Sequence, residues 1–291
     1  MPKGMTKRLK FSGRGRAPST LLKHLRNMYK KGISRPPRLT LKSYEEVQYR
    51  VYFCKKDSNK GLYNLLSKIS KDKTINYSVL LSEEKFLILS RENDLMLDNY
   101  GLTILEETRT FTPIYTIPRG WNIPMNVALE RFSQINPKKG LIPRTIYHGF
   151  SWSELDWKIF NIMAKNVRTK MSVVSKETKT DYMTVKRHFF NTVLPACQIA
   201  HYFYPRGFSS YYQSILRLSS DYEIEIVDAL QKLPCTTYVF PLEEDLLIFL
   251  CHENIAKVIE GFGKMEEKAF IDGFLPYAPL HYSIPDHTEQ I

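Results

Sequence analysis

The residues with the clearest chemistry lie in one short segment, residues 182 to 193. Apolar side chains recur there at positions 185, 189 and 193, four residues apart, as on the buried face of a helix. The other side carries hydroxyls, cations and an amide, which can bind phosphates or the edges of bases. We therefore expect a nucleic acid to contact Tyr182, Thr184, Lys186, Arg187 and Asn191.

Three helices are predicted to position this segment. Residues 153 to 165 predict an amphipathic helix that begins at Ser153, and residues 172 to 177 predict a second, shorter helix. After a turn, the third helix runs from 182 to 193 and ends before Pro195, which cannot continue it. This order is typical of a helix-turn-helix reader, whose third helix enters the major groove of double-stranded DNA.

An aromatic stretch, residues 198 to 208, follows the third helix and ends in Pro205-Arg206-Gly207. We interpret this stretch as the hairpin of a winged helix. A cation at the tip of a wing lies close to the DNA backbone, so we expect Arg206 to contact a phosphate.

The first half contains a related segment. Residues 20 to 27, TLLKHLRN, align with residues 184 to 191, TVKRHFFN, and share Thr, His and Asn. This predicts a second recognition helix with Leu21, Leu25 and Met28 on its core side. Too few residues precede it for two supporting helices, so the reader is reduced. The nucleic-acid contacts that we expect from it are Thr20, Lys23, Arg26 and Asn27.

The first residues form a basic arm with no acidic residue before Glu45. We expect residues 1 to 18 to be disordered alone and to follow phosphates when bound. Arg14 and Arg16 alternate with glycines, as in arms that enter the minor groove. Two alternatives remain open, a solubilising tail and a start codon further upstream.

The chain also repeats a sheet-forming pattern. Residues 235 to 254 align without a gap on residues 74 to 93, and both read as a hairpin that ends in Glu-Asn. A strand and an amphipathic helix precede each hairpin, and a helix and a strand follow it, with the later helix of the first copy near residues 94 to 99. The order β-α-β-β-α-β is that of a ferredoxin-like unit.

These patterns predict an α+β fold of two tandem units, each a helix-turn-helix followed by a ferredoxin-like domain, with the first helix-turn-helix truncated. The predicted segments are a basic arm (1–18), a partial helix-turn-helix (19–44), a first ferredoxin-like domain (45–118), a linker (119–150), a winged helix-turn-helix (151–208), a second ferredoxin-like domain (209–285) and a tail (286–291).

Composition restricts the class of partner. The formal net charge of +12 favours polyanions such as nucleic acid. The longest apolar runs are far shorter than a membrane span, so we expect no membrane partner and a cytoplasmic, nucleoid-associated protein. The cysteines have no metal-binding spacing, and we expect reduced core thiols, no metal and no cofactor. The four are Cys54, Cys197, Cys235 and Cys251.

The arrangement resembles the Lrp/AsnC family of transcriptional regulators, most closely over residues 155 to 275. The first reader helix of that family begins with Leu-Asp, here Leu155-Asp156, and its recognition helix carries Thr-Val before a basic pair, here Lys186-Arg187. The resemblance implies pairing through the sheets, here within one chain, further homo-oligomers and a small-molecule effector. The family's sensing turn usually carries a Gly before its Asp, and residues 242 to 245, LEED, lack one.

We therefore expect a sequence-specific regulator of transcription that binds double-stranded DNA and is not an enzyme. One alternative is a general chromatin or RNA-binding protein, which the basic arm and abundant aromatics would suit. The other is an enzyme, because some relatives of this fold decarboxylate modified tetrapyrroles. Catalysis would need His or Arg side chains that converge in a pocket, and the sequence offers only His252, His281 and scattered arginines.

Overall fold

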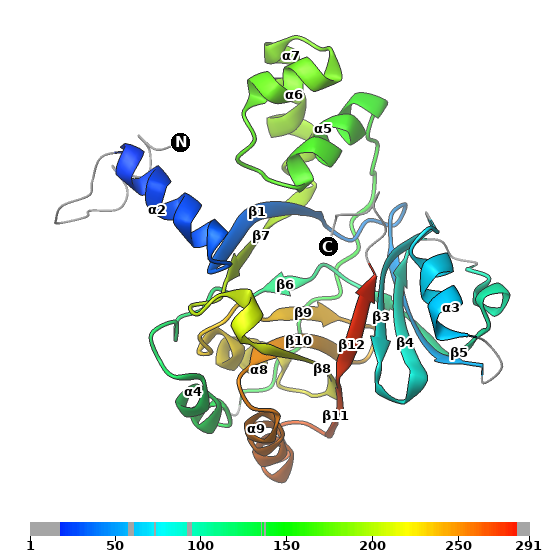
Figure 1. The fold of residues 1–291 in the computed structure, drawn as a ribbon, viewed down its shortest axis with the longest axis vertical. Coiled ribbons are helices and arrows are strands. Elements are labelled where there is room, and N and C mark those ends of the chain that lie inside the picture. The colour runs from blue at the N-terminus through cyan, green and yellow to red at the C-terminus, as the bar shows by residue number, and fades with distance from the viewer. Residues whose placement is uncertain are drawn as a thin grey trace.

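Two five-stranded antiparallel sheets and a two-stranded ribbon organise the chain (Figure 1). The computed structural model describes residues 18–57, 61–72, 74–91, 95–134, 136 and 138–283. Arg14 and Arg16 of the predicted basic arm lie outside these residues. Within them, no helix is long and apolar enough to cross a bilayer.

The first sheet has the strand order β12-β3-β4-β2-β5. Helix α3 and the short 3-10 helices η1 and η2 accompany it, and η2 takes the place of the helix expected near residues 94 to 99. The bounds are β2 (Tyr49–Lys56), α3 (Leu62–Ile69), β3 (Ile75–Leu81), η1 (Ser82–Glu84), β4 (Lys85–Ser90), η2 (Leu97–Tyr100), β5 (Leu102–Thr110) and β12 (Pro279–Ser283).

The second sheet has the order β11-β8-β10-β9-β6 and carries helices α8 and α9. The order of elements in both sheets confirms the predicted α+β class with ferredoxin-like units. The bounds are β6 (Ile114–Tyr115), β8 (Tyr212–Ser219), α8 (Glu223–Gln231), β9 (Tyr238–Pro241), β10 (Leu246–His252), α9 (Ile255–Glu267) and β11 (Gly273–Tyr277).

The two units exchange their last strands. Strand β6, which follows the first unit, pairs with β9 of the second, and β12, which follows the second unit, pairs with β3 of the first. Each sheet is therefore completed by the other half of the chain, as in a dimer related by a twofold axis.

The sheets pack face to face because their strands alternate. In β2, Tyr52 and Cys54 face α3, whereas Val51 and Phe53 pack against residues of the second sheet such as Leu247. Ion pairs close the rim of this interface. Arg217 of β8 donates to Glu106 of β5 at 2.6 Å and also binds Asp245 of its own unit.

The ribbon joins the two reader segments. Helix α2 (Pro18–Lys30) leads into β1 (Ser34–Leu41), and helix α7 (Tyr182–His188) with its π-helical continuation η3 (Phe189–Val193) leads towards β7 (Cys197–Phe203). Strands β1 and β7 pair in antiparallel register, with Leu41 opposite Cys197.

The wing hairpin predicted over residues 198 to 208 is wrong. Strand β7 pairs with β1 from the other half of the chain, so no second wing strand is needed. The turn after β7, which includes the 3-10 helix η4 (Phe208–Ser210), instead contacts the residues that follow α2, where the amide of Phe208 donates to the carbonyl oxygen of Gly32 at 3.1 Å. Gly207 has φ of +89°, and a Cβ there would lie 2.6 Å from the carbonyl oxygen of Lys31.

The segment predicted as a linker, residues 119 to 150, contains helix α4 (Met125–Phe132). This helix packs on α9, and the rings of Phe132 and Phe262 have centroids 4.8 Å apart. The segment is therefore part of the second unit's core. Its apolar face is only two turns long, which sequence periodicity did not resolve.

Candidate nucleic-acid interface and inter-sheet cavity

The predicted reader forms three packed helices (Figure 1), namely α5 (Glu154–Ala164), α6 (Met171–Thr178) and α7 with η3. Val185 and Val193 are fully buried and Phe189 is 3% exposed, which confirms the predicted core stripe. Leu39 and Leu41 of β1 belong to the same core. The reader therefore rests on the ribbon as well as on its own helices.

Polar contacts fix how the helices meet. Ser153 and Asp156 form a capping box at the start of α5, and Oδ1 of Asp156 lies 2.8 Å from Nδ1 of His188 on α7. Burial alone would raise the pKa of Asp156, but the hydrogen bonds from Ser153 and His188 outweigh it and lower that pKa. Asp181 caps α7 by accepting hydrogen bonds from the amides of Met183 and Thr184.

The outer face of α7 carries the side chains that the sequence singled out. Lys186, Arg187 and Asn191 are exposed, Tyr182 is 47% exposed, and Thr184 is partly buried beside the cap. Two apolar residues on this face were not predicted, Met183 at 66% and Phe190 at 48% exposure. Apolar atoms among cations suit a base-edge surface, where the thymine methyl group is an apolar target.

Arg206 lies elsewhere. It follows β7 in the turn near α2, and its guanidinium pairs with Glu253 at 2.9 Å. The expected wing is absent from this position because β7 pairs with β1. A phosphate contact by Arg206 stays a prediction. Its original reason, a position at the tip of a wing, no longer holds.

Helix α2 extends away from the body of the molecule (Figure 1). Of its predicted contacts, Lys23, Arg26 and Asn27 are exposed and Thr20 is partly buried. The side chains predicted as its core are only half-buried, because the described residues 18–57 include no counterparts of α5 and α6 to cover them. Those side chains are Leu21, Leu25 and Met28.

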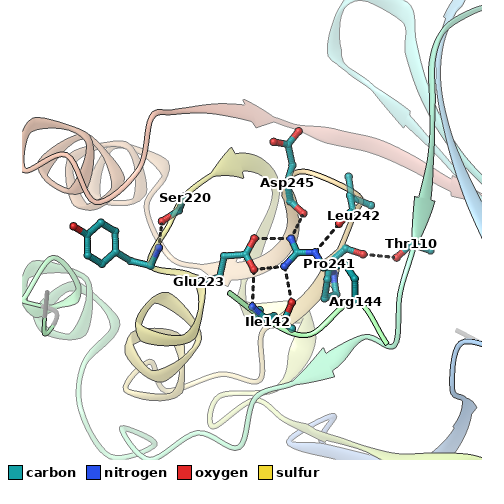
Figure 2. Close-up of polar contacts among 9 residues, drawn as sticks. Thr110, Ile142, Arg144, Ser220, Glu223, Pro241, Leu242 and Asp245 are labelled. Carbon is teal, nitrogen blue, oxygen red and sulfur yellow. Dashed lines mark hydrogen bonds and ion pairs between the residues drawn. The ribbon is translucent and has the colours of Figure 1, made fainter. Parts of the chain in front are cut away.

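The turn at residues 242 to 245, which was compared with the sensing turn of the Lrp/AsnC family, is covered by Arg144 of the same chain. Figure 2 shows Arg144 donating hydrogen bonds to the carbonyl oxygens of Leu242 and Ile142, at 3.0 and 2.7 Å. The same guanidinium binds Glu223, which is 1% exposed, with 2.5 Å between Nη2 and Oε1. A buried carboxylate such as that of Glu223 needs a cationic partner. The ion pair therefore holds residues 142 to 144 over the turn at residues 242 to 245.

A cavity of about 260 Å³ lies between the two sheets, beneath the ribbon. Arg35 and Arg38 of β1 both line it because Pro36 and Pro37 interrupt the pairing with β7 and form a bulge. The hydroxyl of Tyr202, a residue only 6% exposed, has no hydrogen-bond partner among the described residues. Most of the remaining wall is made of aliphatic and aromatic side chains from both sheets, and Gln213, Ser214 and Cys251 line it too.

The chain is similar in fold to a siroheme decarboxylase. The crystal structure of the siroheme decarboxylase NirDL matches with a TM-score of 0.52 and 8% sequence identity, over 92% of this chain and 83% of that chain. The structure of NirDL in co-complex with an iron-uroporphyrin III analogue gives the same values. No family model and no curated protein sequence matches the chain.

This likeness corrects one expectation. We predicted that the chain is not an enzyme, and its fold is shared with an enzyme across nearly the whole length. The sequence hid the residues of the cavity, because Arg35, Arg38 and Tyr202 converge only through the ribbon and the stacked sheets. Among the described residues, no group of three or more His, Cys, Asp or Glu side chains is placed to hold a metal ion.

Proposed function

We propose that this chain is a transcriptional regulator of the Lrp/AsnC type that binds double-stranded DNA through α7. The main evidence is the third helix of the reader, α7. One face of this helix is exposed and cationic, and the opposite face is buried. A helix held this way can enter the major groove without rearrangement. Arg187 and Asn191 would pair with base edges, and Lys186 and Tyr182 would contact phosphates.

The ribbon offers a second contact. Helices α2 and α7 join the antiparallel ribbon at opposite ends, since Ser34 lies opposite Phe203 and Leu41 lies opposite Cys197. The exposed Lys23, Arg26 and Asn27 would then lie along the same duplex. The chain would thus resemble a paired regulator with one complete and one reduced reader.

Substitution of Arg187 tests this function. A duplex site is selected from a random pool, and its affinity is measured by fluorescence anisotropy at one fixed salt concentration. Arg187→Ala should weaken binding by about 1–3 kcal/mol. Arg131→Ala, an exposed arginine on α4 far from the reader, is the matched control and should bind like the unsubstituted protein. If both variants are folded and bind the duplex with equal affinity, α7 is not the helix that recognises DNA.

The cavity supports a second function, an enzyme that acts on a carboxylic acid between the sheets. Two arginines could hold a carboxylate there, and the unpartnered phenol of Tyr202 could donate a proton to the carbon that loses carbon dioxide. To test this, the chain is incubated with carboxylic acids that range in size from aromatic acids to tetrapyrroles, and the release of carbon dioxide is measured. Release that Tyr202→Phe abolishes supports it, and a bound acid that stays intact contradicts it.

A further inference from the structure

We propose that the inter-sheet cavity is a binding site for a compact, flat, apolar carboxylate of about two fused rings, held at its carboxylate by Arg35 and Arg38. The inference rests on the cavity named in the second function above, and it concerns binding alone. It holds with or without catalysis at the same place.

The volume limits the size of the ligand. A cavity of about 150 Å³ lined by apolar side chains accommodates benzene. The cavity here measures about 260 Å³. It therefore encloses about two fused aromatic rings, and the four pyrrole rings of a tetrapyrrole would have to extend out of it into solvent.

The walls are mostly apolar and aromatic. Both sheets contribute aliphatic side chains, such as Leu87 and Leu89 from β4 and Leu247 from β10, and the aromatic rings include Phe240 and Phe249. The rings of Phe240 and Phe249 pack edge to face with 5.4 Å between centroids. Such walls favour a flat ligand that removes its apolar surface from water.

The charge at the mouth is positive. The exposed guanidinium of Arg35 lies over the ring of Phe208, 4.3 Å from its centroid, and Arg38 is half-buried. None of the described residues that line the cavity is acidic. Arginine binds carboxylates in two-pronged fashion, so this pair selects an anion over a neutral ligand.

Tyr202 adds a third polar group. Strand pairing places it opposite Arg35, and its hydroxyl is buried without a partner among the described residues. A buried hydroxyl without a hydrogen bond is costly, and a ligand oxygen at this point would remove that cost. Two cations and one buried donor without a partner among the described residues thus line a cavity whose wall is mostly apolar.

The test uses 2-naphthoate as the probe and isothermal titration calorimetry on the full chain. We expect saturable binding of one molecule per chain, at least tenfold weaker binding of the neutral 2-naphthalenemethanol, and at least tenfold weaker binding of a tetrapyrrole carboxylate. Arg38→Ala and Tyr202→Phe should each weaken naphthoate binding, by about tenfold or more for Arg38→Ala, while Arg38→Lys should retain part of it.

Two controls keep the result interpretable. Arg131→Ala should bind naphthoate like the unsubstituted chain, and Arg187→Ala should also do so, because the DNA-binding face is separate. Failure of naphthoate to bind at millimolar concentration, equal binding of the neutral alcohol, or preferred binding of the tetrapyrrole would each overturn the proposal. An unchanged affinity in Arg38→Ala, shown to be folded by its thermal unfolding, would overturn it as well.

Discussion

At the scale of single residues, the reader depends on one buried carboxylate. Asp156 accepts hydrogen bonds from the amide and hydroxyl of Ser153 and contacts His188, so it joins the start of α5 to α7. The sequence indicated the cap and the helix that it starts. It did not indicate the contact with His188, because that depends on how two helices cross.

Replacement of Asp156 should destabilise the chain. We expect Asp156→Ala to lower the free energy of unfolding by about 1–3 kcal/mol, since it removes the cap of α5 and the hydrogen bond to the partly buried His188. Urea unfolding followed by circular dichroism measures this. Glu154→Ala, at an exposed position of the same first turn, is the control and should have a much smaller effect.

The same carboxylate makes stability depend on pH. The pKa of Asp156 is lower in the folded chain than the ordinary value of 3.8. Its contribution is therefore fully present above that ordinary value and is lost as pH falls through the folded pKa. Thermal unfolding between pH 7 and pH 2 should show a steeper loss for the unsubstituted chain than for Asp156→Asn. Parallel curves would show that this contact contributes nothing.

At the scale of elements, sequence periodicity predicted the helices and hairpins whose formation depends on local sequence. The core stripe of α7, helix α3, helix α9 and both hairpins are present, because each buries one face at a regular spacing. The partner of β7 was missed because it lies in the other half of the chain. The bulge at Pro36 and Pro37 could not be predicted without knowing that β1 pairs with β7. The cavity that this bulge helps to form was therefore missed too.

The junction between the ribbon and α2 depends on Gly207. Both Gly207 and Gly149 have positive φ, +89° and +76°, but only at Gly207 would a Cβ meet backbone, the carbonyl oxygen of Lys31 at 2.6 Å. Gly149→Ala should cost about 1 kcal/mol from the left-handed backbone alone, and Gly207→Ala should cost clearly more. Equal losses in a denaturant titration would mean that the turn does not hold α2.

At the scale of the whole molecule, strand exchange should make the two units unfold together. The four cysteines report on this, because Cys54 lies in the first sheet, Cys197 in the ribbon, and Cys235 and Cys251 in the second unit. Burial raises the pKa of each thiol to about 12. Only a thiolate reacts readily, so the native chain should resist alkylation.

Alkylation by iodoacetamide at pH 8, followed by mass spectrometry of peptides, tests the cooperativity. We expect no label in the native chain and one common urea midpoint for all four cysteines. Labelling of Cys54 at a lower urea concentration than Cys251 would show that the first unit opens independently.

The most direct measurement of the central claim is a competition between DNA sequences. The duplex selected from a random pool should bind at least ~10³-fold more tightly than bulk duplex DNA at the same salt concentration. Arg187→Ala should reduce that ratio more than it reduces binding to bulk DNA. Equal competition by bulk DNA, or a ratio unchanged by Arg187→Ala, would contradict sequence-specific recognition by α7.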